Sequence, residues 1–343
     1  MIVFHLDERT VMAVLITGAT GYIGSHTVVE LLNRGYETVL VDNLSNSDIS
    51  VLDKIEEITG KRPVFYELDV AIRENVERIF SENHIDAVIH FAGLKAVGES
   101  CKLPSLYYYN NIASATAVSD VAARHGCFKI IFSSSATVYG EPETVPITED
   151  FPLHTSNPYG TTKLLIENIY RDAYAYDNRW NITLLRYFNP IGSHESGLLG
   201  DDPNGIPNNL MPYITRVAAG QLEKLSVFGN DYPTRDGTGV RDYIHVVDLA
   251  IGHVAALERM TETGVHTFNL GTGKGCSVLE IIEAFERVNG VKIPYVITER
   301  RSGDVPEYYA DSSKAERELG WKAERDIDDM CRSAWNFIVR TKK

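Results

Sequence analysis

Residues 12–24 read MAVLITGATGYIG and set a short apolar run directly before a glycine-rich turn. The run at residues 12–17 has the length and the side chains of a buried β-strand. Gly18, Gly21 and Gly24 come after it and lead into an amphipathic stretch. Glycines between a strand and a helix let backbone N–H groups approach a pyrophosphate, whose negative charge the helix N-terminus favours. Glycine spacing alone also suits an ordinary tight turn, so the interpretation depends on the residues downstream of Gly24.

A second apolar run, residues 38–41, ends at Asp42, eighteen residues after Gly24. A carboxylate at this position accepts hydrogen bonds from the hydroxyls of an adenosine ribose and repels a 2′-phosphate. Asn43 and Leu44 come next, where an NADP-dependent protein more often has an arginine. The segment therefore predicts NAD rather than NADP as the cofactor.

Strand-like and helical stretches continue to alternate along the first half of the chain. Further strands and helices are expected near residues 64–68, 73–82, 87–91, 97–124 and 129–132. This alternation predicts an α/β protein with a doubly wound parallel sheet, whose ligands bind at the carboxyl ends of the strands. After Asn189 the alternation loosens into loops rich in glycine and proline, which predicts a smaller substrate-binding region.

These patterns predict two domains. A Rossmann domain is expected at residues 12–188 together with a returning segment, residues 243–258. A smaller α/β domain is expected at residues 189–242 and 259–343. Residues 1–11 have no place in the first strand, and we expect them to be a start-site extension or a tail.

Tyr159 and Lys163 are four residues apart, which places a phenol and an amine on one face of a helix. An ammonium next to a phenol stabilises the phenolate and lowers a pKa that is otherwise about 10, so the pair can act as a base near neutral pH. Such pairs also occur on ordinary solvated helix faces. The serines at 133–135, at the end of the strand expected at 129–132, favour a functional interpretation, because a hydroxyl that faces a phenolate can orient a substrate oxygen.

The composition argues against several classes of protein. The formal net charge of -14 opposes nonspecific binding to nucleic acid or anionic membranes. No apolar run approaches the ~20 residues of a membrane span, and the first ten residues do not resemble a signal peptide. The four cysteines are scattered without metal-ligand or disulfide spacing, which predicts free thiols in the cytoplasm and no metal site.

Several longer stretches make the chain resemble the extended short-chain dehydrogenase/reductases, and more narrowly the UDP-galactose 4-epimerase family. Besides Tyr159 and Lys163, they are residues 18–26 (GATGYIGSH), 91–100 (FAGLKAVGES), 133–140 (SSSATVYG), 185–190 (LRYFNP), 205–212 (GIPNNLMP) and 239–245 (GVRDYIH). The similarity extends from about residue 13 to about residue 335. Long stretches in order are far more specific than one glycine motif.

The resemblance implies that the protein interconverts UDP-galactose and UDP-glucose in galactose metabolism, with a tightly bound NAD. Tyr159 would take the proton from the sugar O4 while the C4 hydride passes to NAD, and Ser135 would hold O4. Lys163 would hold the nicotinamide ribose and tune Tyr159. The resulting 4-keto sugar turns and receives the hydride on its opposite face, so C4 is inverted without net oxidation. A homodimer, packed through the helix near residues 97–124 and the helix of Tyr159, is also implied.

Two sets of binding residues are implied by the resemblance. Those expected to hold NAD are Gly18, Gly21, Tyr22, Ile23, Gly24, Asp42, Asn43, Asn46, Ser47, Asp69, Val70, Phe91, Ala92, Gly93, Lys95, Asn110, Ser133, Tyr159, Lys163 and Phe188. Those expected to hold the UDP-sugar are Lys95, Ser135, Tyr159, Tyr187, Asn189, Asn208, Asn209, Phe228, Arg241, Arg301, Asp304 and Tyr308. The guanidinium groups suit a pyrophosphate, and the bulk of Tyr308 leaves little room for an N-acetyl group at C2 of the sugar.

Three alternatives compete with an epimerase of this kind. A 4,6-dehydratase of the same fold carries an Asp-Glu pair directly after the residue matching Ser135, whereas this chain has Ala136 and Thr137. A related epimerase acts on N-acetylated UDP-hexoses. A nonenzymatic NAD-binding module typically loses the tyrosine or the lysine, and this chain keeps both.

Overall fold

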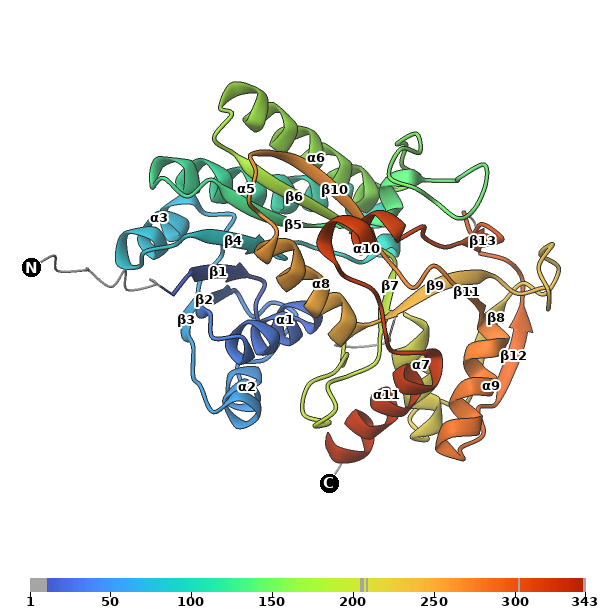
Figure 1. Ribbon diagram of the computed structural model, residues 1–343. Helices are drawn as coiled ribbons and strands as arrows, with labels where there is room; N and C mark the ends of the chain where they lie inside the picture. Colours follow the sequence, from blue (N-terminus) through green and yellow to red (C-terminus); the bar gives the residue numbers. More distant parts are fainter. Residues whose placement is uncertain (1–10, 204–206, 208, 302, 342–343) are drawn as a thin grey trace, which may run out of the picture.

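Seven parallel strands form the central sheet, in the order β10-β6-β5-β4-β1-β2-β3 (Figure 1). The strands are β1 (Ala13–Thr17), β2 (Glu37–Asp42), β3 (Val64–Glu67), β4 (Ala87–His90), β5 (Lys129–Ser135), β6 (Asn181–Tyr187) and β10 (Gly264–Leu270). The strand order reverses between β1 and β4, which leaves a crevice at their carboxyl ends. The predicted doubly wound α/β fold is confirmed.

The computed structural model describes residues 11–203, 207, 209–301 and 303–341. The predicted extension at residues 1–11 therefore lies outside the described residues, except for Val11. Within the described ranges, no helix combines the length and the apolar character needed to cross a bilayer.

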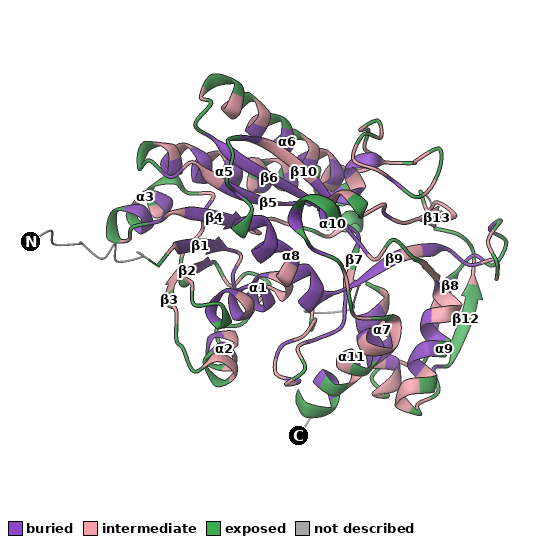
Figure 2. Ribbon diagram, viewed as in Figure 1, coloured by how far each residue is buried: buried purple, intermediate pink, exposed green. Residues whose placement is uncertain are grey.

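Helices cover both faces of the sheet, and its inner strands are buried on both sides, whereas the edge strand β3 is partly exposed (Figure 2). One apolar cluster joins the sheet to α1 (Tyr22–Asn33), α2 (Val51–Thr59), α8 (Val246–Glu258) and α10 (Ser313–Leu319). The cluster on the other face joins it to α3 (Arg73–Glu82), α5 (Pro104–Arg124) and α6 (Pro158–Tyr176). This double burial explains why the strands read as continuous apolar runs rather than alternating ones.

The helical stretch expected at residues 97–124 is two helices, α4 (Val97–Lys102) and α5, which begins at Pro104. Proline disfavours the helical conformation in the residue before it, and it suits the first position of a new helix. Leu103 accordingly has a φ of -127° between the two helices. The single long helix predicted from the sequence is thus corrected to a broken pair.

The smaller region is built around β9 (Val240–His245), which pairs with β7 (Asn189–Ile191), β11 (Gly275–Ser277) and β13 (Glu307–Tyr308). A separate two-stranded sheet joins β8 (Leu225–Phe228) to β12 (Tyr295–Thr298). Helices α7 (Leu210–Ala218), α9 (Val278–Asn289) and α11 (Ile327–Thr341) share an apolar cluster with these strands. A short 3-10 helix, η1 (Ala136–Tyr139), comes after β5.

Two predicted domain boundaries are wrong. The sequence pattern assigns residues 264–270 to the smaller domain, but β10 is the edge strand of the large sheet and pairs with β6. The returning segment is predicted to contribute a strand and a helix to the large domain. Only α8 does so, because β9 pairs within the small sheet. Strand composition does not reveal which neighbour a strand pairs with, so the sequence leaves this choice open.

The turn after β1 has room only for glycines at two of its positions. Gly18 has a φ of +67°, and its N–H donates to the carbonyl oxygen of Val41 at 2.9 Å. A Cβ added to Gly24 would overlap the carbonyl oxygen of Gly18. The first turn of α1 therefore packs directly on the backbone of the glycine turn that precedes it.

We expect Gly24→Ala to destabilise the fold by roughly 2 kcal/mol or more, because the new methyl group must push two backbone segments apart. Gly98→Ala is the matched control: Gly98 also lies in a helix, and no atom lies within 4 Å of its added Cβ. Thermal unfolding of both variants measures the difference. Equal melting temperatures would contradict this account of the turn.

Candidate active site

Asp42 ends β2 with its carboxylate held by the surrounding backbone. Its oxygens accept hydrogen bonds from the N–H groups of Thr20 (3.1 Å) and Leu44 (3.0 Å), and from the Ser47 hydroxyl (3.3 Å). Leu44 has a φ of +55°, a conformation that side chains rarely adopt, and this turn directs its N–H at Asp42. A fixed carboxylate beside the glycine turn suits the hydroxyls of an adenosine ribose.

The loop after β4 is clamped by a residue that the sequence pattern does not single out. The Asn111 side chain accepts from the N–H of Leu94 at 2.7 Å and donates to the carbonyl oxygen of Leu94 at 3.0 Å. It also donates to the Thr162 hydroxyl on α6 at 3.0 Å. The predicted cofactor residue Asn110 is the half-buried neighbour of Asn111. Adjacent asparagines on one helix do not reveal from the sequence which of them points inward.

The structure brings the three predicted catalytic residues together at the carboxyl ends of β5 and β6. The Ser135 oxygen accepts from the Thr137 N–H (3.2 Å) and hydroxyl (2.9 Å), while Ser135 and Tyr159 share a hydrogen bond. A hydroxyl that already accepts twice has its own proton free to donate. The Lys163 ammonium donates to the carbonyl oxygen of Ser133 at 2.6 Å.

The ionisation of this group differs from the sequence-based expectation. Burial raises the pKa of the Tyr159 phenol above its ordinary value, although the hydrogen bond with Ser135 opposes the shift. Burial also lowers the pKa of Lys163 to about 7. The ammonium lies 5.9 Å from the centre of the Tyr159 ring and is directed at Ser133 instead. The predicted lowering of the Tyr159 pKa by Lys163 is therefore not seen in this arrangement.

Aromatic side chains line the neighbouring wall. The Tyr187 hydroxyl hydrogen-bonds to that of Ser133, and the rings of Phe188 and Tyr308 lie 5.5 Å apart between centroids. The Tyr308 hydroxyl donates to the carbonyl oxygen of Ala136 at 2.6 Å. Tyr308 is thus held by η1, and its bulk is fixed beside Phe188.

Four more of the predicted substrate residues gather on the small region. Asp304 lies between two guanidinium groups, at 2.9 Å from Arg301 and 3.5 Å from Arg241. The Arg301 guanidinium also lies over the Phe228 ring, 4.9 Å from its centre. The two guanidinium groups suit a pyrophosphate, and the adjacent face of the Phe228 ring suits a nucleotide base.

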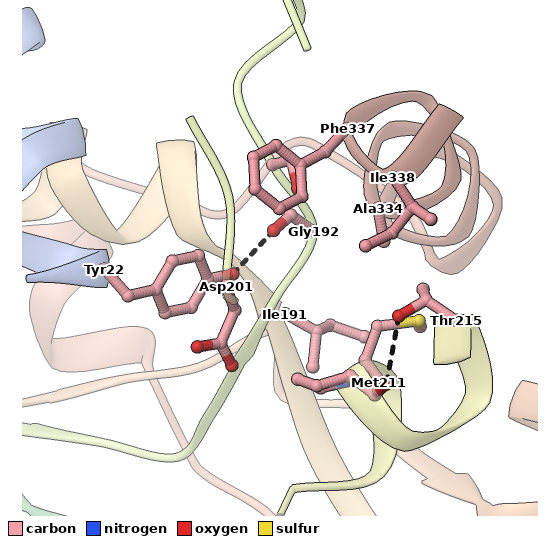
Figure 3. A pocket seen from close by; sticks show the side chains of 11 residues that line it. Tyr22, Ile191, Gly192, Asp201, Met211, Thr215, Ala334, Phe337 and Ile338 are labelled. Atoms are coloured by element: carbon pink, nitrogen blue, oxygen red, sulfur yellow. Dashed lines mark hydrogen bonds between the residues drawn. The ribbon is translucent and has the colours of Figure 1, made fainter. Parts of the chain in front are cut away.

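Tyr22 contributes differently from what the sequence predicts. Its hydroxyl donates to the carbonyl oxygen of Gly192 at 2.7 Å and so joins the glycine turn to β7 (Figure 3). Behind it lies a cavity of about 10 Å³ between α1, α7 and α11, with Asp201, Met211 and Phe337 in its lining. Because the Tyr22 hydroxyl is bonded to Gly192, a cofactor at the glycine turn would contact the backbone of Tyr22 rather than its side chain.

The remaining predicted residues are less closely engaged. Lys95, Asn189 and Asn209 are exposed, as are Asn43 and Asn46. The Asp69 carboxylate accepts from the N–H of Ala71 at 2.8 Å and closes its own turn. Asn208 lies outside the described residues. Among the residues that the structure describes, no cluster of three or more histidine, cysteine, aspartate or glutamate side chains has the geometry to hold a metal ion.

Comparisons with known proteins show which family the chain resembles over its length. The UDP-glucose 4-epimerase of Bacillus subtilis (strain 168) is 60% identical over 327 residues, which are 95% of this chain and 96% of the relative. A crystal structure of UDP-glucose 4-epimerase from Bifidobacterium longum in complex with NAD+ and UDP is 56% identical, with a TM-score of 0.94, over 96% of this chain and 99% of that one. The UDP-Glc/GlcNAc 4-epimerase from Campylobacter jejuni is 36% identical, with a TM-score of 0.84, over 96% and 99% of the two chains.

The chain belongs to the UDP-glucose 4-epimerase family. The resemblance drawn from the sequence is thereby confirmed, together with the assignment to the NAD-dependent epimerases and dehydratases.

A family model described as GDP-mannose 4,6 dehydratase also matches residues 15–334. A dehydratase of this fold carries an acid and a base directly after the residue that matches Ser135, and this member of the epimerase family has neither there. The Ala136 side chain is a buried methyl group, and the Thr137 hydroxyl donates to Ser135. The match therefore reflects the fold that epimerases and dehydratases share.

The residues of this epimerase family member fit NAD. Gly18 and Gly24 leave no Cβ between the first strand and the helix N-terminus, so the backbone there is open to a pyrophosphate. Asp42 ends β2, where an adenosine ribose is expected, and Ser133, Tyr159 and Lys163 lie near the carboxyl end of β5 and the start of α6. A carboxylate at the ribose position also disfavours the 2′-phosphate of NADP.

We expect Asp42→Asn to weaken NAD binding about 10- to 100-fold, because neutral hydrogen bonds replace charge-assisted ones. The same change should narrow the preference for NAD over NADP. Titration of the cofactor-stripped protein with each dinucleotide measures both effects. Equal affinity of the unchanged protein for the two dinucleotides would refute the assignment of Asp42.

Proposed function

We propose that the protein inverts the configuration at C4 of UDP-glucose and of UDP-galactose, through a transient 4-keto sugar. The observation that carries this proposal is the group formed by the buried Ser135 and Lys163 with the half-buried Tyr159 beside a dinucleotide crevice, with no proton-transferring side chain at positions 136 and 137. Such a site can remove and return one proton and one hydride at the same carbon. It has no group placed to eliminate water.

Within this proposal, Tyr159 and Ser135 handle the sugar O4. NAD supplies the hydride acceptor and donor when it is bound. The Ser135 hydroxyl, whose oxygen already accepts twice from Thr137, donates to O4 and orients it toward Tyr159. Tyr159 then accepts the O4 proton during oxidation and gives it back during reduction, as a general base and acid.

Lys163 has two tasks in the proposal. Its ammonium is anchored on the Ser133 carbonyl, at the edge where the nicotinamide ribose is expected. With its pKa lowered to about 7, the side chain can gain or lose charge near neutral pH as charged groups approach it. An approaching ribose hydroxyl or a forming phenolate favours the charged form, which in turn stabilises the phenolate of Tyr159.

The nucleotide must stay bound while the keto sugar turns. Arg241 and Arg301 lie beside each other on the small region and can hold the pyrophosphate, with Phe228 beneath the base. The sugar end faces the rings of Phe188 and Tyr308. Flat aromatic side chains allow the sugar ring to present either of its faces. The pyrophosphate, held by the two arginines, stays in place while the sugar turns.

The test is to give the purified protein UDP-galactose without added NAD and to follow the C4 configuration by proton NMR. We expect conversion to UDP-glucose, because the tightly bound cofactor is regenerated in each turnover. Tyr159→Phe should lower the rate by about 10²- to 10⁴-fold, the range for loss of a general acid or base.

Absence of conversion in the unchanged protein, even with NAD supplied, would refute the epimerase proposal. That result would favour a nonenzymatic NAD-binding module. Circular dichroism of Tyr159→Phe serves as the control for folding, so that a loss of rate is assigned to the missing phenol.

Tyr308 supports a preference for substrates without an N-acetyl group at C2. Its ring packs against Phe188 and its hydroxyl is fixed on the Ala136 carbonyl, so the side chain cannot easily swing away. An acetamido group in the pocket would have to displace this ring. The alternative, an epimerase for N-acetylated UDP-hexoses, requires a smaller side chain at this place.

We expect turnover of UDP-N-acetylglucosamine to be at least about 100-fold slower than that of UDP-glucose, in keeping with the cost of steric overlap in a packed site. Tyr308→Ser should raise the rate on the acetylated substrate more than on UDP-glucose. Steady-state kinetics on both substrates measures the ratio. Comparable turnover by the unchanged protein would exclude a gating role for Tyr308.

We also propose the homodimer that the family resemblance implies. Leu103, Leu106 and Tyr109, at the start of α5, are 48%, 47% and 75% exposed, and Leu165 on the adjacent α6 is 38% exposed. Apolar side chains that gather on neighbouring helices favour burial against a second copy. Four free cysteines support the expected reducing, cytoplasmic compartment.

A further inference from the structure

Glu167 lies one helical turn after Lys163 on α6 and has no exposed surface. Its carboxylate accepts from the Ser134 hydroxyl at 2.6 Å. The same carboxylate pairs with the buried Arg186, whose Nε and Nη2 donate at 2.8 and 2.6 Å. Ser134 and Arg186 are register partners on β5 and β6, so both strands bind one carboxylate of the helix.

Each of the two strand residues that bind Glu167 is adjacent to a residue of the proposed site. Ser134 stands between Ser133, which accepts from Lys163, and Ser135, which bonds to Tyr159. Arg186 precedes Tyr187. The Arg186 guanidinium continues to the Tyr139 hydroxyl at 3.0 Å, at the end of η1. The contact therefore spans both elements that carry the reacting groups.

On the helix side, the spacing repeats. Tyr159, Lys163 and Glu167 are four residues apart and share one face of α6. The Arg171 guanidinium adds a fourth contact to the carboxylate from the solvent side, at 3.2 Å. The helix is thus held on the sheet by charged hydrogen bonds directly beneath its two catalytic residues.

We propose that Glu167 is a positioning residue: through Ser134 and Arg186 it fixes the catalytic helix on β5 and β6, and so holds Tyr159 and Lys163 at Ser135 and Ser133. This inference rests on the proposed epimerase function and deepens it. A bidentate pair sets direction as well as distance, which an apolar contact cannot do. The need is strict, because displacing a reacting group by about 1 Å costs about 100-fold in rate.

The decisive variant is the double substitution Glu167→Met with Arg186→Met. Removing one charge would leave its partner buried and unpaired, whereas replacing both with apolar chains of similar size often preserves stability. We expect a melting temperature near that of the unchanged protein and a KM changed less than about threefold. We expect kcat to fall by about 100-fold, because the helix then lacks its fixed register.

The pH profile of kcat separates positioning from simple stability. In the proposed reaction, the charged form of Lys163 stabilises the Tyr159 phenolate. With the helix loosened this stabilisation weakens, so the acidic limb should move to higher pH. Asp248→Asn is the matched control. Asp248 is 2% exposed, pairs with Arg325, and lies on α8 across the sheet from α6. Its variant should lose stability while keeping the pH profile and kcat.

The unchanged protein is assayed first, and its failure to turn over UDP-galactose would overturn the proposed function together with this inference. With an active parent, a stable double variant that keeps the parent kcat and pH profile overturns the inference alone. So does a fall in kcat that Asp248→Asn reproduces at the same loss of stability.

Ser134→Ala decides the matter when the double variant does not fold. It removes one donor to Glu167 and leaves the ion pair in place. We expect a kcat about 3- to 10-fold lower at an unchanged melting temperature, a loss typical of one neutral hydrogen bond. A kcat equal to that of the parent would then overturn the positioning role.

Discussion

All seven strands of the large sheet run in the same direction, and the rest of the molecule depends on that constraint. Parallel pairing forces every connection to cross a face of the sheet, so that all the carboxyl ends emerge along one edge. Residues far apart in the chain, such as Asp42 at the end of β2 and Ser135 at the end of β5, therefore come to lie along the same edge. The reversal of strand order between β1 and β4 opens a crevice where the glycine turn lies. The common direction of the strands therefore determines where the site lies, and the side chains at the strand ends determine what it can bind.

Burial has opposite consequences for two kinds of charged group near this edge. Lys163 is buried with its ammonium on the carbonyl oxygen of Ser133, and burial lowers its pKa to about 7, which leaves it responsive to an approaching ligand. Glu167 and Arg186 are buried against each other, and both remain charged because each satisfies the other. Burial alone would lower the pKa of Arg186, but its hydrogen bonds to Glu167 raise that pKa above the ordinary value. Lys163 on α6 can thus change its charge, whereas Glu167 on the same helix and its partner Arg186 on β6 stay charged.

The sequence predicts strands β1 to β5 of the large sheet, because buried parallel strands are continuous apolar runs, but it does not predict β6 or β10. The helix at Arg73–Glu82 and the strand before the first glycine lie within a residue of their predicted bounds. The sequence could not predict that β10 returns to the large sheet, because the residues of an edge strand do not specify the strand with which it pairs. Nor could it distinguish Asn111 from Asn110, or find the contact between Glu167, Ser134 and Arg186. These depend on which side chains meet across three elements, and periodicity along one element does not contain that information. The catalytic residues could be predicted because a longer resemblance accompanies them, and the structure places Ser135, Tyr159 and Lys163 near one another.

The late return of β10 has a consequence for how the protein is made. The large sheet is complete only after residue 270 has been added, and Trp321, which seals the same apolar cluster and bonds the Asp248 carbonyl at 2.9 Å, comes later still. An emerging chain must therefore hold an open sheet edge at β6 while the small region is synthesised. Neither region can be cut out as a contiguous fragment with its own finished core. The two are expected to melt as one cooperative unit, and gene fusions or insertions are better tolerated at the outer loops than at the junctions between the regions.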